Sequence, residues 1–376
     1  MKELFFISIF LIIYVYFAYP VLLMALSLFK SKKNDISGIE PLVSIIITAF
    51  NEEKHIREKI TRSLSLDYPG EKLEIIVASD GSTDKTDSIV KEFEPKGVKL
   101  IRVEGRLGKT ETQNQAVKIA AGEIIIFTDA TTWYNKDVIG KLVRNFAGET
   151  VGCAGGELSY VNPEYKITGE GGGLYWKYER MLKSLESKVS SLIGVSGCLY
   201  ALRKKLYSPI DSEQISDFVI AQQIVEKGYR VVYEPQAKSF ELVSEKNKDE
   251  FKMRIRVALR SLHGIWHMRR MLNPFKHGLY TVQIISHKIL RYAAPVLLIV
   301  LFLTNIFLLK DFFFLIFFLL QCLFYAAALF GFYFPQLAQR LKLYVPYYFC
   351  LVNFAALIAL GKFITGKKQV TWEPIR

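Results

Sequence analysis

Long apolar runs lie at both ends of this chain and leave a polar middle between them. Residues 4–29 form one continuous apolar run, and a helix that crosses a bilayer needs about 20 such residues. Further apolar segments lie at residues 293–309, 312–332 and 345–360. We therefore expect a multi-pass protein of the inner or plasma membrane with one soluble domain between its membrane segments.

We interpret the first run as a retained anchor formed by residues 1–33. Only Lys2 precedes it as a basic residue, no small-residue cleavage pattern follows it, and a cluster of lysines comes directly after it, at Lys30, Lys32 and Lys33. Because basic residues mark the cytoplasmic ends of membrane helices, we expect the soluble domain in the cytoplasm. The alternative is a cleaved signal peptide followed by a secreted domain.

The basic balance of the chain points to the membrane. The formal net charge is +13 and the pI is about 9.3, which fits anionic lipid, phosphorylated substrates or nucleic acid. The basic residues are dispersed and concentrate beside apolar segments, and no nucleic-acid recognition motif is present. We expect membrane lipids, and not nucleic acid, as the partner of this charge.

Short apolar runs alternate with polar, helix-like stretches from residue 41 onward. We predict strands at residues 42–48, 73–79, 98–103 and 123–128, with helices at residues 52–65, 83–93 and 110–120 between them. This alternation predicts an α/β domain with a Rossmann-like, mostly parallel sheet and helices on both faces. The carboxyl ends of such strands share one crevice, and every predicted strand here is followed by polar residues.

The fourth strand ends in the segment EIIIFTDATT, residues 123–132. Its apolar run is too short for a helix and too apolar for an exposed edge, so it predicts a strand buried on both faces. Asp129 then stands at the ligand-binding end of the sheet. By itself Asp129 is equally well explained as a cap of a turn or of the next helix.

Five segments together carry a family resemblance. They are VSIIITAFNEE, EIIVASDGSTDKT, GKTETQNQAVKIAAGEIIIFTDA, GVSGCLYALRKKLY and SDFVIAQQIVEKGYRVVYEP. In this order and spacing the chain resembles membrane-bound family 2 glycosyltransferases of the GT-A fold, in the branch that includes cellulose-synthase-like and poly-N-acetylglucosamine-synthase-like enzymes. The resemblance covers about residues 41–291. It implies a GT-A domain at residues 41–240. The residue pattern adds amphipathic interface helices at 241–292, where charged residues at 287, 288 and 291 stand among apolar ones, a C-terminal membrane region at 293–361 and a basic tail at 362–376.

The resemblance implies a nucleotide-sugar donor, with uridine as the nucleoside. The implied donor-binding residues are Thr48, Ala49, Asn51, Glu52, Asp80, Gly81, Lys109, Asp129 and Arg256. Asp80 can accept hydrogen bonds from a base N–H or from ribose hydroxyls, and Gly81 permits close backbone approach. The alternative for Asp80 is an Asx-type turn or a helix cap before Thr83.

A divalent metal, Mg²⁺ or Mn²⁺, is also implied. Asp129 occupies the position of the first acid in the family's DxD motif, whose metal bridges the diphosphate oxygens and acts as a Lewis acid on the leaving group. Thr131 replaces the second acid. One carboxylate with waters is still compatible with Mg²⁺, so the departure leaves the strength and choice of the metal open.

On the acceptor side, Asp217 matches the family's general base. An inverting transfer needs a carboxylate that takes the proton of the attacking hydroxyl. Ser216 replaces the acid that usually precedes this base, and the alternative for Asp217 is an N-cap of the following helix. The resemblance also implies an acceptor loop that contains Gly194, Ser196 and Gly197.

The processive signature of the family is incomplete in residues 252–260. Arg256 takes the place of the arginine in QxxRW, but Met253 and Val257 replace the glutamine and the tryptophan. We therefore expect an inverting, metal-dependent transfer of one or a few sugars to a lipid-linked or nascent glycan acceptor. A processive polysaccharide synthase and a catalytically weak membrane scaffold are the alternatives. The side of the tail and the number of C-terminal crossings stay open.

Overall fold

One mixed sheet forms the centre of the α/β domain. The computed structural model describes residues 1–30, 34–161, 173–242, 247–341 and 343–369, so Lys32, Lys33 and the end of the basic tail lie outside the described residues. Within these ranges, eight strands follow the order β3-β2-β1-β4-β7-β6-β8-β5. They are β1 (Val43–Ala49), β2 (Leu73–Asp80), β3 (Val98–Val103), β4 (Ile124–Asp129), β5 (Trp133–Tyr134), β6 (Val151–Val161), β7 (Leu199–Arg203) and β8 (Arg230–Leu242).

The four strands predicted from the sequence form a parallel half of this sheet. β1 pairs with β2 and β4, and β2 pairs with β3, all in parallel register. β7 runs antiparallel between β4 and β6, and β5 runs antiparallel to β8. The sheet is therefore mixed overall. Its parallel half, with helices on both faces, confirms the predicted α/β fold class.

Helices cover both faces of the sheet, which explains why every residue of β1 is buried. Ile45 and Ile47 face α3 (Ile56–Leu64), α4 (Thr86–Lys91) and α6 (Val138–Val143), whereas Ile46 faces α5 (Lys109–Ile119) and α8 (Ser216–Glu226). Successive strand residues point to opposite faces, and both faces are shielded from solvent. This is why the strand reads as a continuous apolar run and not as an alternating pattern.

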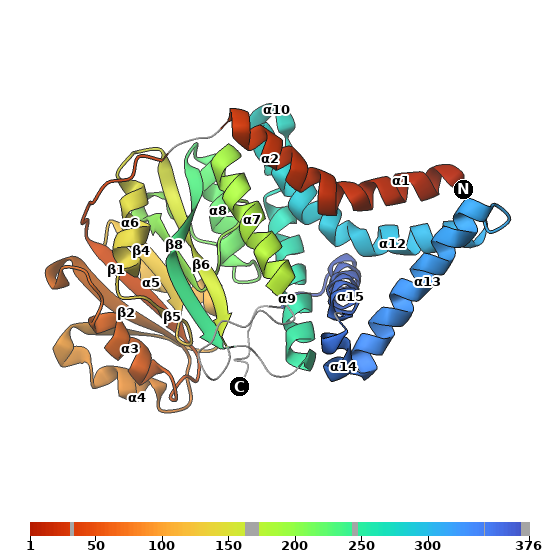
Figure 1. Ribbon diagram of the computed structural model, residues 1–376. Coiled ribbons are helices and arrows are strands. Elements are labelled where there is room, and N and C mark those ends of the chain that lie inside the picture. The colour runs from red at the N-terminus through yellow and green to blue at the C-terminus, as the bar shows by residue number, and fades with distance from the viewer. Residues whose placement is uncertain (31–33, 162–172, 243–246, 342, 370–376) are drawn as a thin grey trace.

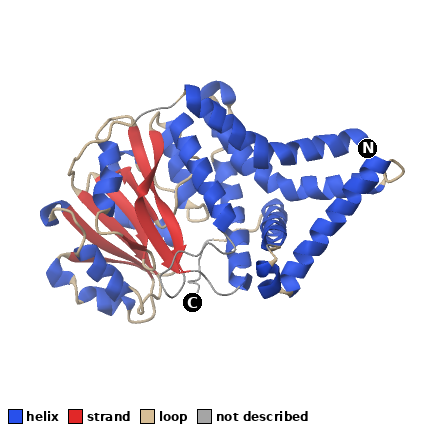
Figure 2. Cartoon of the chain, viewed as in Figure 1, coloured by secondary structure: helices blue, strands red, loops and turns tan. Residues whose placement is uncertain are grey.

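Among the described residues, four helices are long and apolar enough to cross a membrane, as judged by length and composition. They are Lys2–Phe29, Leu279–Ile306, Phe312–Tyr333 and Tyr344–Ile364. The first comprises α1 (Lys2–Ile13), η1 (Tyr14–Ala18) and α2 (Tyr19–Phe29), and the second comprises α11 (Leu279–Ile284), η7 (Ile285–Ile289) and α12 (Leu290–Ile306). The other two are α13 (Phe312–Tyr333) and α15 (Tyr344–Ile364). This finding agrees with the expectation of a membrane protein, and Figure 2 shows these helices projecting away from the strands.

Residues 279–292, the end of the predicted interface region, form the first part of the second of these helices. The helix continues through η7 into α12. No proline or glycine interrupts residues 279–294, so nothing in the backbone stops it. Within it, His287 is buried, and its ring binds Glu186 of α7 (Gly173–Val189).

The helix α15 is oriented differently from the other long apolar helices. In Figure 1 it is seen almost along its axis, whereas α1 and α12 lie across the view. It packs on α9 (Asn247–His267), where the rings of Phe251 and Phe354 stack with centroids 5.9 Å apart. Just after α15, the ammonium of Lys368 pairs with Glu213 at 2.6 Å. The end of α15 therefore returns to the α/β domain.

The remaining described elements are short. They are α10 (Pro274–His277), α14 (Pro335–Arg340), η2 (Gly70–Lys72), η3 (Glu94–Lys96), η4 (Arg144–Phe146), η5 (Lys204–Leu206) and η6 (Arg269–Leu272).

Candidate active site

The carboxyl ends of the parallel strands meet at one edge of the sheet. Thr48 stands in register with Ala78 of β2 and with Asp129 of β4. The side chain of Thr48 is buried and its Oγ1 has no hydrogen-bond partner within the described part of the chain, and the neighbouring Ala49 is also buried. The register therefore brings these predicted donor-binding residues to one place.

Asn51 and Glu52 connect the loop after β1 to the loop after β2 through hydrogen bonds. Asn51 has a positive φ of 53°, and its Oδ1 accepts a hydrogen bond from the amide of Thr83 at 2.7 Å. The amide of Glu52 donates to Oγ1 of Thr86 at 2.8 Å, and its carboxylate binds the ring of His55 at 2.9 Å. These contacts give both side chains a positioning role, and their contact with a donor stays a prediction.

Asp80 holds the loop that leads into α5. Its side chain is fully buried, and Oδ1 accepts hydrogen bonds from the amides of Leu107 at 2.9 Å and Gly108 at 3.1 Å. Gly81 has a φ of +65°, and a Cβ at that position would lie 2.3 Å from the carbonyl oxygen of Gly105. The Asp80 carboxylate therefore binds the backbone just before α5, and its predicted contact with a nucleoside stays a prediction.

Lys109 connects the two halves of the predicted site. Its ammonium forms an ion pair with Oδ1 of Asp129 and donates a hydrogen bond to the carbonyl oxygen of Gly197 at 3.1 Å. Asp129 belongs to the predicted donor side and Gly197 to the predicted acceptor loop. Lys109 is the first residue of α5, so the hydrogen bonds of Asp80 to the two preceding residues also help to position Lys109.

Asp217 lies against the predicted acceptor loop. A Cβ added to Gly197 would stand 2.6 Å from its Oδ2, and the amide of Val195 donates to its carbonyl oxygen at 3.2 Å. The N-cap of α8 is Ile215, so Asp217 lies in the first turn and does not cap the helix. Gly194 packs on the neighbouring Phe218.

The surroundings of Asp217 suit a proton acceptor. Burial raises the pKa of its carboxyl above the ordinary value, although the positive charges of Lys109, Lys288 and Arg260 oppose this effect. A higher pKa makes the carboxylate a stronger base at neutral pH. Ser196, the third residue predicted in the acceptor loop, is close to Cys198, with 3.2 Å between Oγ and Sγ.

Asp129 and Glu241 are the carboxylates that fit a hard divalent cation. The side chain of Asp129 is 32% exposed, so a diphosphate can reach it. The pKa of the Glu241 carboxyl is raised by burial and then by the negative charge of Asp129, and a cation between two such groups would relieve their repulsion. Among the described residues no group of three or more metal-ligand side chains is present. This set fits Mg²⁺ or Mn²⁺ held by one or two carboxylates with water and substrate phosphate.

The sequence reasoning missed a buried lysine behind Asp129. Lys59 is 1% exposed, and its Nζ donates to Oγ1 of Thr128 at 2.8 Å and to the carbonyl oxygen of Thr132 at 2.6 Å. It also lies 4.0 Å from the ring centroid of Tyr134. The available signal was a basic residue on the otherwise apolar face of α3, between Ile56 and Ile60.

A second missed residue is Arg260 on α9. Its Nη2 donates to Oγ1 of Thr110 at 3.0 Å and to the carbonyl oxygen of Gln214, and its charge acts on Asp217. The predicted Arg256 lies one turn earlier on the same face of this helix. It is partly buried and has contacts of its own, so its predicted role toward a diphosphate stays a prediction.

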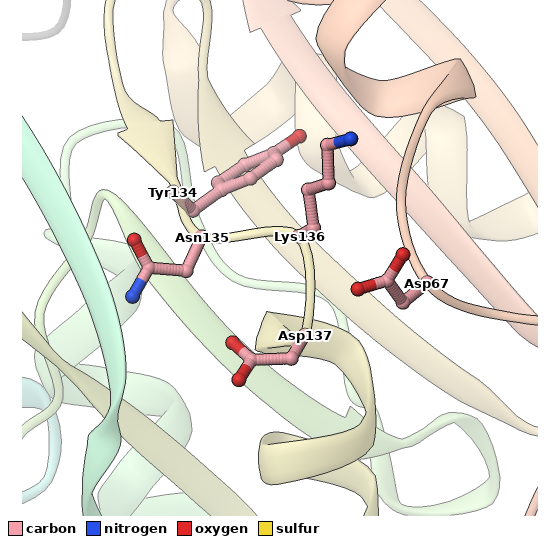
Figure 3. Close-up of a pocket in the computed structure, with 5 residues that line it drawn as sticks. All are labelled: Asp67, Tyr134, Asn135, Lys136 and Asp137. Atoms are coloured by element: carbon pink, nitrogen blue, oxygen red, sulfur yellow. The ribbon is translucent and has the colours of Figure 1, made fainter.

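An open hollow elsewhere on the surface holds none of the predicted residues. It measures about 500 Å³ and is lined by Asp67, Tyr134, Asn135, Lys136 and Asp137 (Figure 3). Since neither Asp129 nor Asp217 borders it, we assign the candidate chemistry to the charged edge described above.

Part of this chain is similar in sequence to known glycosyltransferases. Residues 44–208 match the model of glycosyl transferase family 2. A poly-beta-1,6-N-acetyl-D-glucosamine synthase from Staphylococcus epidermidis is 28% identical over 240 residues, which cover 62% of this chain and 57% of that synthase. A synthase of the same description from Staphylococcus aureus (strain COL) is 26% identical over 237 residues, covering 61% of this chain and 57% of the relative. This chain thus matches little more than half the length of these relatives.

One solved structure resembles the whole arrangement. It is a mannosyltransferase from Pyrobaculum calidifontis in complex with GDP-Man and Mn²⁺, with a TM-score of 0.72 and 24% sequence identity. The superposition covers 97% of this chain and 99% of that one. The likeness therefore extends beyond the α/β domain to the apolar helices, and it shows the shared fold.

Proposed function

We propose that the chain, whose residues 44–208 match the model of glycosyl transferase family 2, is an inverting glycosyltransferase that acts at the membrane. It transfers a sugar from a nucleotide-sugar donor to a lipid-linked or glycan acceptor. One observation carries the proposal: the ammonium of Lys109 pairs with Asp129 and binds the carbonyl oxygen of Gly197, the residue against which the Asp217 carboxylate is packed. A donor acid and an acceptor base thus stand on either side of one lysine.

The proposed reaction assigns a separate role to each of these groups. Asp217 takes the proton of the acceptor hydroxyl while that oxygen attacks the anomeric carbon. The bond from the anomeric carbon to the diphosphate breaks, and the nucleoside diphosphate leaves with the electron pair. Lys109 stays beside the leaving phosphate and balances its charge. A divalent metal held by Asp129 and Glu241 would supply Lewis-acid stabilisation to the same diphosphate.

The number of sugars transferred belongs to the proposal as well. Met253 and Val257 stand where the processive pattern has glutamine and tryptophan, which favours one or a few transfers. The relatives that the chain resembles are described as polymer synthases, and this supports the processive synthase as the second candidate. Product length measured by mass spectrometry separates the two.

We propose a topology in which the α/β domain and the basic tail after α15 both lie on the cytoplasmic side of the membrane. The ion pair of Lys368 with Glu213 supports a tail on the domain's side, and the contact of Lys2 with Asp311 at 3.6 Å supports a shared far end for α1 and α13. This gives three crossings, with α15 lying along the interface. An impermeant maleimide added to intact cells should label Lys2→Cys and leave Lys368→Cys unlabelled until the cells are opened. The reverse pattern would exclude this topology.

The activity can be tested with purified protein in nanodiscs. A panel of UDP- and GDP-sugars is supplied with and without Mg²⁺ or Mn²⁺, and nucleotide release is measured. We expect one donor to be consumed, and both a chelator and Asp217→Asn to abolish turnover. Asp137→Asn removes an exposed acid and is the matched control. Donor binding without any turnover, in the presence of membrane lipids, would favour the scaffold alternative.

A further inference from the structure

Lys288 is a charged residue inside an apolar helix, close to the proposed base. It lies in the segment Leu279–Ile306, which is long and apolar enough to cross a membrane. Its Nζ stands 5.6 Å from the ring centroid of Phe218, the residue that follows Asp217. Its charge acts on the Asp217 carboxylate. Ionisable residues within membrane-spanning helices are energetically costly, and they mark functional sites or pair with other groups.

The acids on the facing helix α7 are already occupied by other partners. Glu179 pairs with Arg291 and with His287, the latter at 3.3 Å. Glu186 accepts hydrogen bonds from the hydroxyl of Tyr19 at 2.7 Å and from the ring of His287 at 2.7 Å. Lys288 acts electrostatically on Glu179 and Asp217 but forms no ion pair with any residue that the structure describes.

The position of Lys288 relative to Asp217 is fixed by close packing around Phe218. A Cβ added to Gly264 of α9 would lie 3.0 Å from this ring, and one added to Gly194 of the acceptor loop would lie 3.4 Å from it. The ring is therefore held between two backbones, and the ammonium of Lys288 rests over it. The ammonium of Lys288 therefore lies next to the residue that follows the proposed base, on a helix long and apolar enough to cross a membrane.

We propose that Lys288 binds a phosphate group of a lipid acceptor, and that this group adjoins the hydroxyl from which Asp217 takes its proton. The inference rests on the proposed function and narrows its acceptor to the class of phosphate-bearing lipids. A lysine is a strong point-charge partner for phosphate. A neutral acceptor would leave this partly buried ammonium without an ion-pair partner among the described residues. An acceptor that enters from the bilayer places its lipid chain along the apolar helices and its phosphate at Lys288.

Decyl phosphate is the probe for this site. Binding of the radiolabelled probe is measured by scintillation proximity with the full-length protein in a neutral detergent, and decanol and inorganic phosphate are the competitors. We expect saturable binding that becomes about tenfold weaker in Lys288→Met, as for loss of one charge-assisted contact. Lys288→Arg should retain most of the affinity. Lys276→Met, which removes an exposed lysine of α10, should bind as the native protein does.

Several outcomes would overturn the inference. Equal affinity of Lys288→Met and native protein would remove Lys288 from the site. Competition by decanol as strong as by decyl phosphate would mean that only the apolar chain is recognised, and equally strong competition by inorganic phosphate would indicate a site for free phosphate. If Lys288→Met does not fold, as judged by thermal unfolding, Lys288→Gln keeps a polar side chain and permits the same comparison.

The test also separates this inference from the proposed function. Nucleotide release from a donor does not require the lipid phosphate, because water can replace the acceptor. A protein that releases nucleotide but does not bind decyl phosphate keeps the proposed function and loses the inference. A protein that binds decyl phosphate through Lys288 but consumes no donor keeps the phosphate site and loses the proposed function.

Discussion

Replacing the buried Lys59 with methionine should change how the stability of the protein depends on pH. Burial lowers the pKa of this ammonium from 10.5 to about 7, although the charges of Asp129 and Glu241 oppose the effect. Between these two pH values the unfolded chain holds the proton and the folded protein does not. The free energy of unfolding therefore rises with pH in this window, by up to about 1.4 kcal/mol per pH unit for this group. Methionine removes this dependence.

The size of the effect follows from the same two values. Near pH 6 the native protein keeps a buried charge whose desolvation costs on the order of 5 kcal/mol relative to the neutral amine. Methionine avoids this cost but loses the hydrogen bonds to Thr128 and Thr132, worth about 1 kcal/mol each. We expect Lys59→Met to be more stable than the native protein by about 3 kcal/mol near pH 6. The advantage should disappear near pH 9 to 10.

Thermal unfolding followed by tryptophan fluorescence measures this difference in a neutral detergent between pH 6 and pH 9.5. Every other titrating group is common to both proteins, so the difference between their unfolding temperatures reports Lys59. Lys54→Met, which removes an exposed lysine before the same helix, should keep the native pH dependence. If Lys59→Met is less stable than the native protein by the same margin at every pH, the reasoning from desolvation is wrong.

Three further predictions concern the glycines and the base of the site. Gly197→Ala should slow transfer about a hundredfold, as expected for displacement of a catalytic group, because its Cβ would lie 2.6 Å from Oδ2 of Asp217. We expect kcat to fall while the affinity for the nucleotide is unchanged. A loss of nucleotide affinity alone would contradict this prediction. Gly81→Ala should destabilise the protein by more than about 1 kcal/mol, since its φ is +65° and its Cβ would lie 2.3 Å from the carbonyl oxygen of Gly105; an unchanged unfolding temperature would refute it. Since burial raises the pKa of Asp217, the transfer rate should fall on acidification at a higher pH than for an ordinary aspartate, and a pH–rate profile without that early fall would argue against Asp217 as the base.

The parallel half of the sheet could be predicted because its determinants are local. Strands buried on both faces are mostly apolar, so the centre of β1 is a run of three isoleucines and β4 begins with three isoleucines and a phenylalanine. Parallel neighbours then place their carboxyl ends together without any further information. Asp129 and Thr48 could be assigned to one edge on this basis.

The roles of individual side chains were less predictable. The sequence allowed Asp217 to be a helix cap, and only the observed start of α8 after Ile215 excludes that role. For Asp80 the sequence suggested contact with a nucleoside, an Asx-type turn or a helix cap before Thr83, and it gave no sign that the carboxylate binds the amides of Leu107 and Gly108. Which amide a carboxylate reaches depends on the path of a distant loop.

The sequence by itself determined the periodic features: the apolar runs long enough for a bilayer, the alternation of strands and helices, and the residues at the strand ends. Tertiary structure alone decided what stands opposite those residues. Lys59 binds Thr128, the residue before Asp129, although the two are 69 positions apart in the chain. Lys288, on an apolar helix, lies over the ring of Phe218, the residue after Asp217. Burial and pairing of charges depend on contacts across the fold, and no local pattern in a sequence encodes the distance between two charges far apart in the chain.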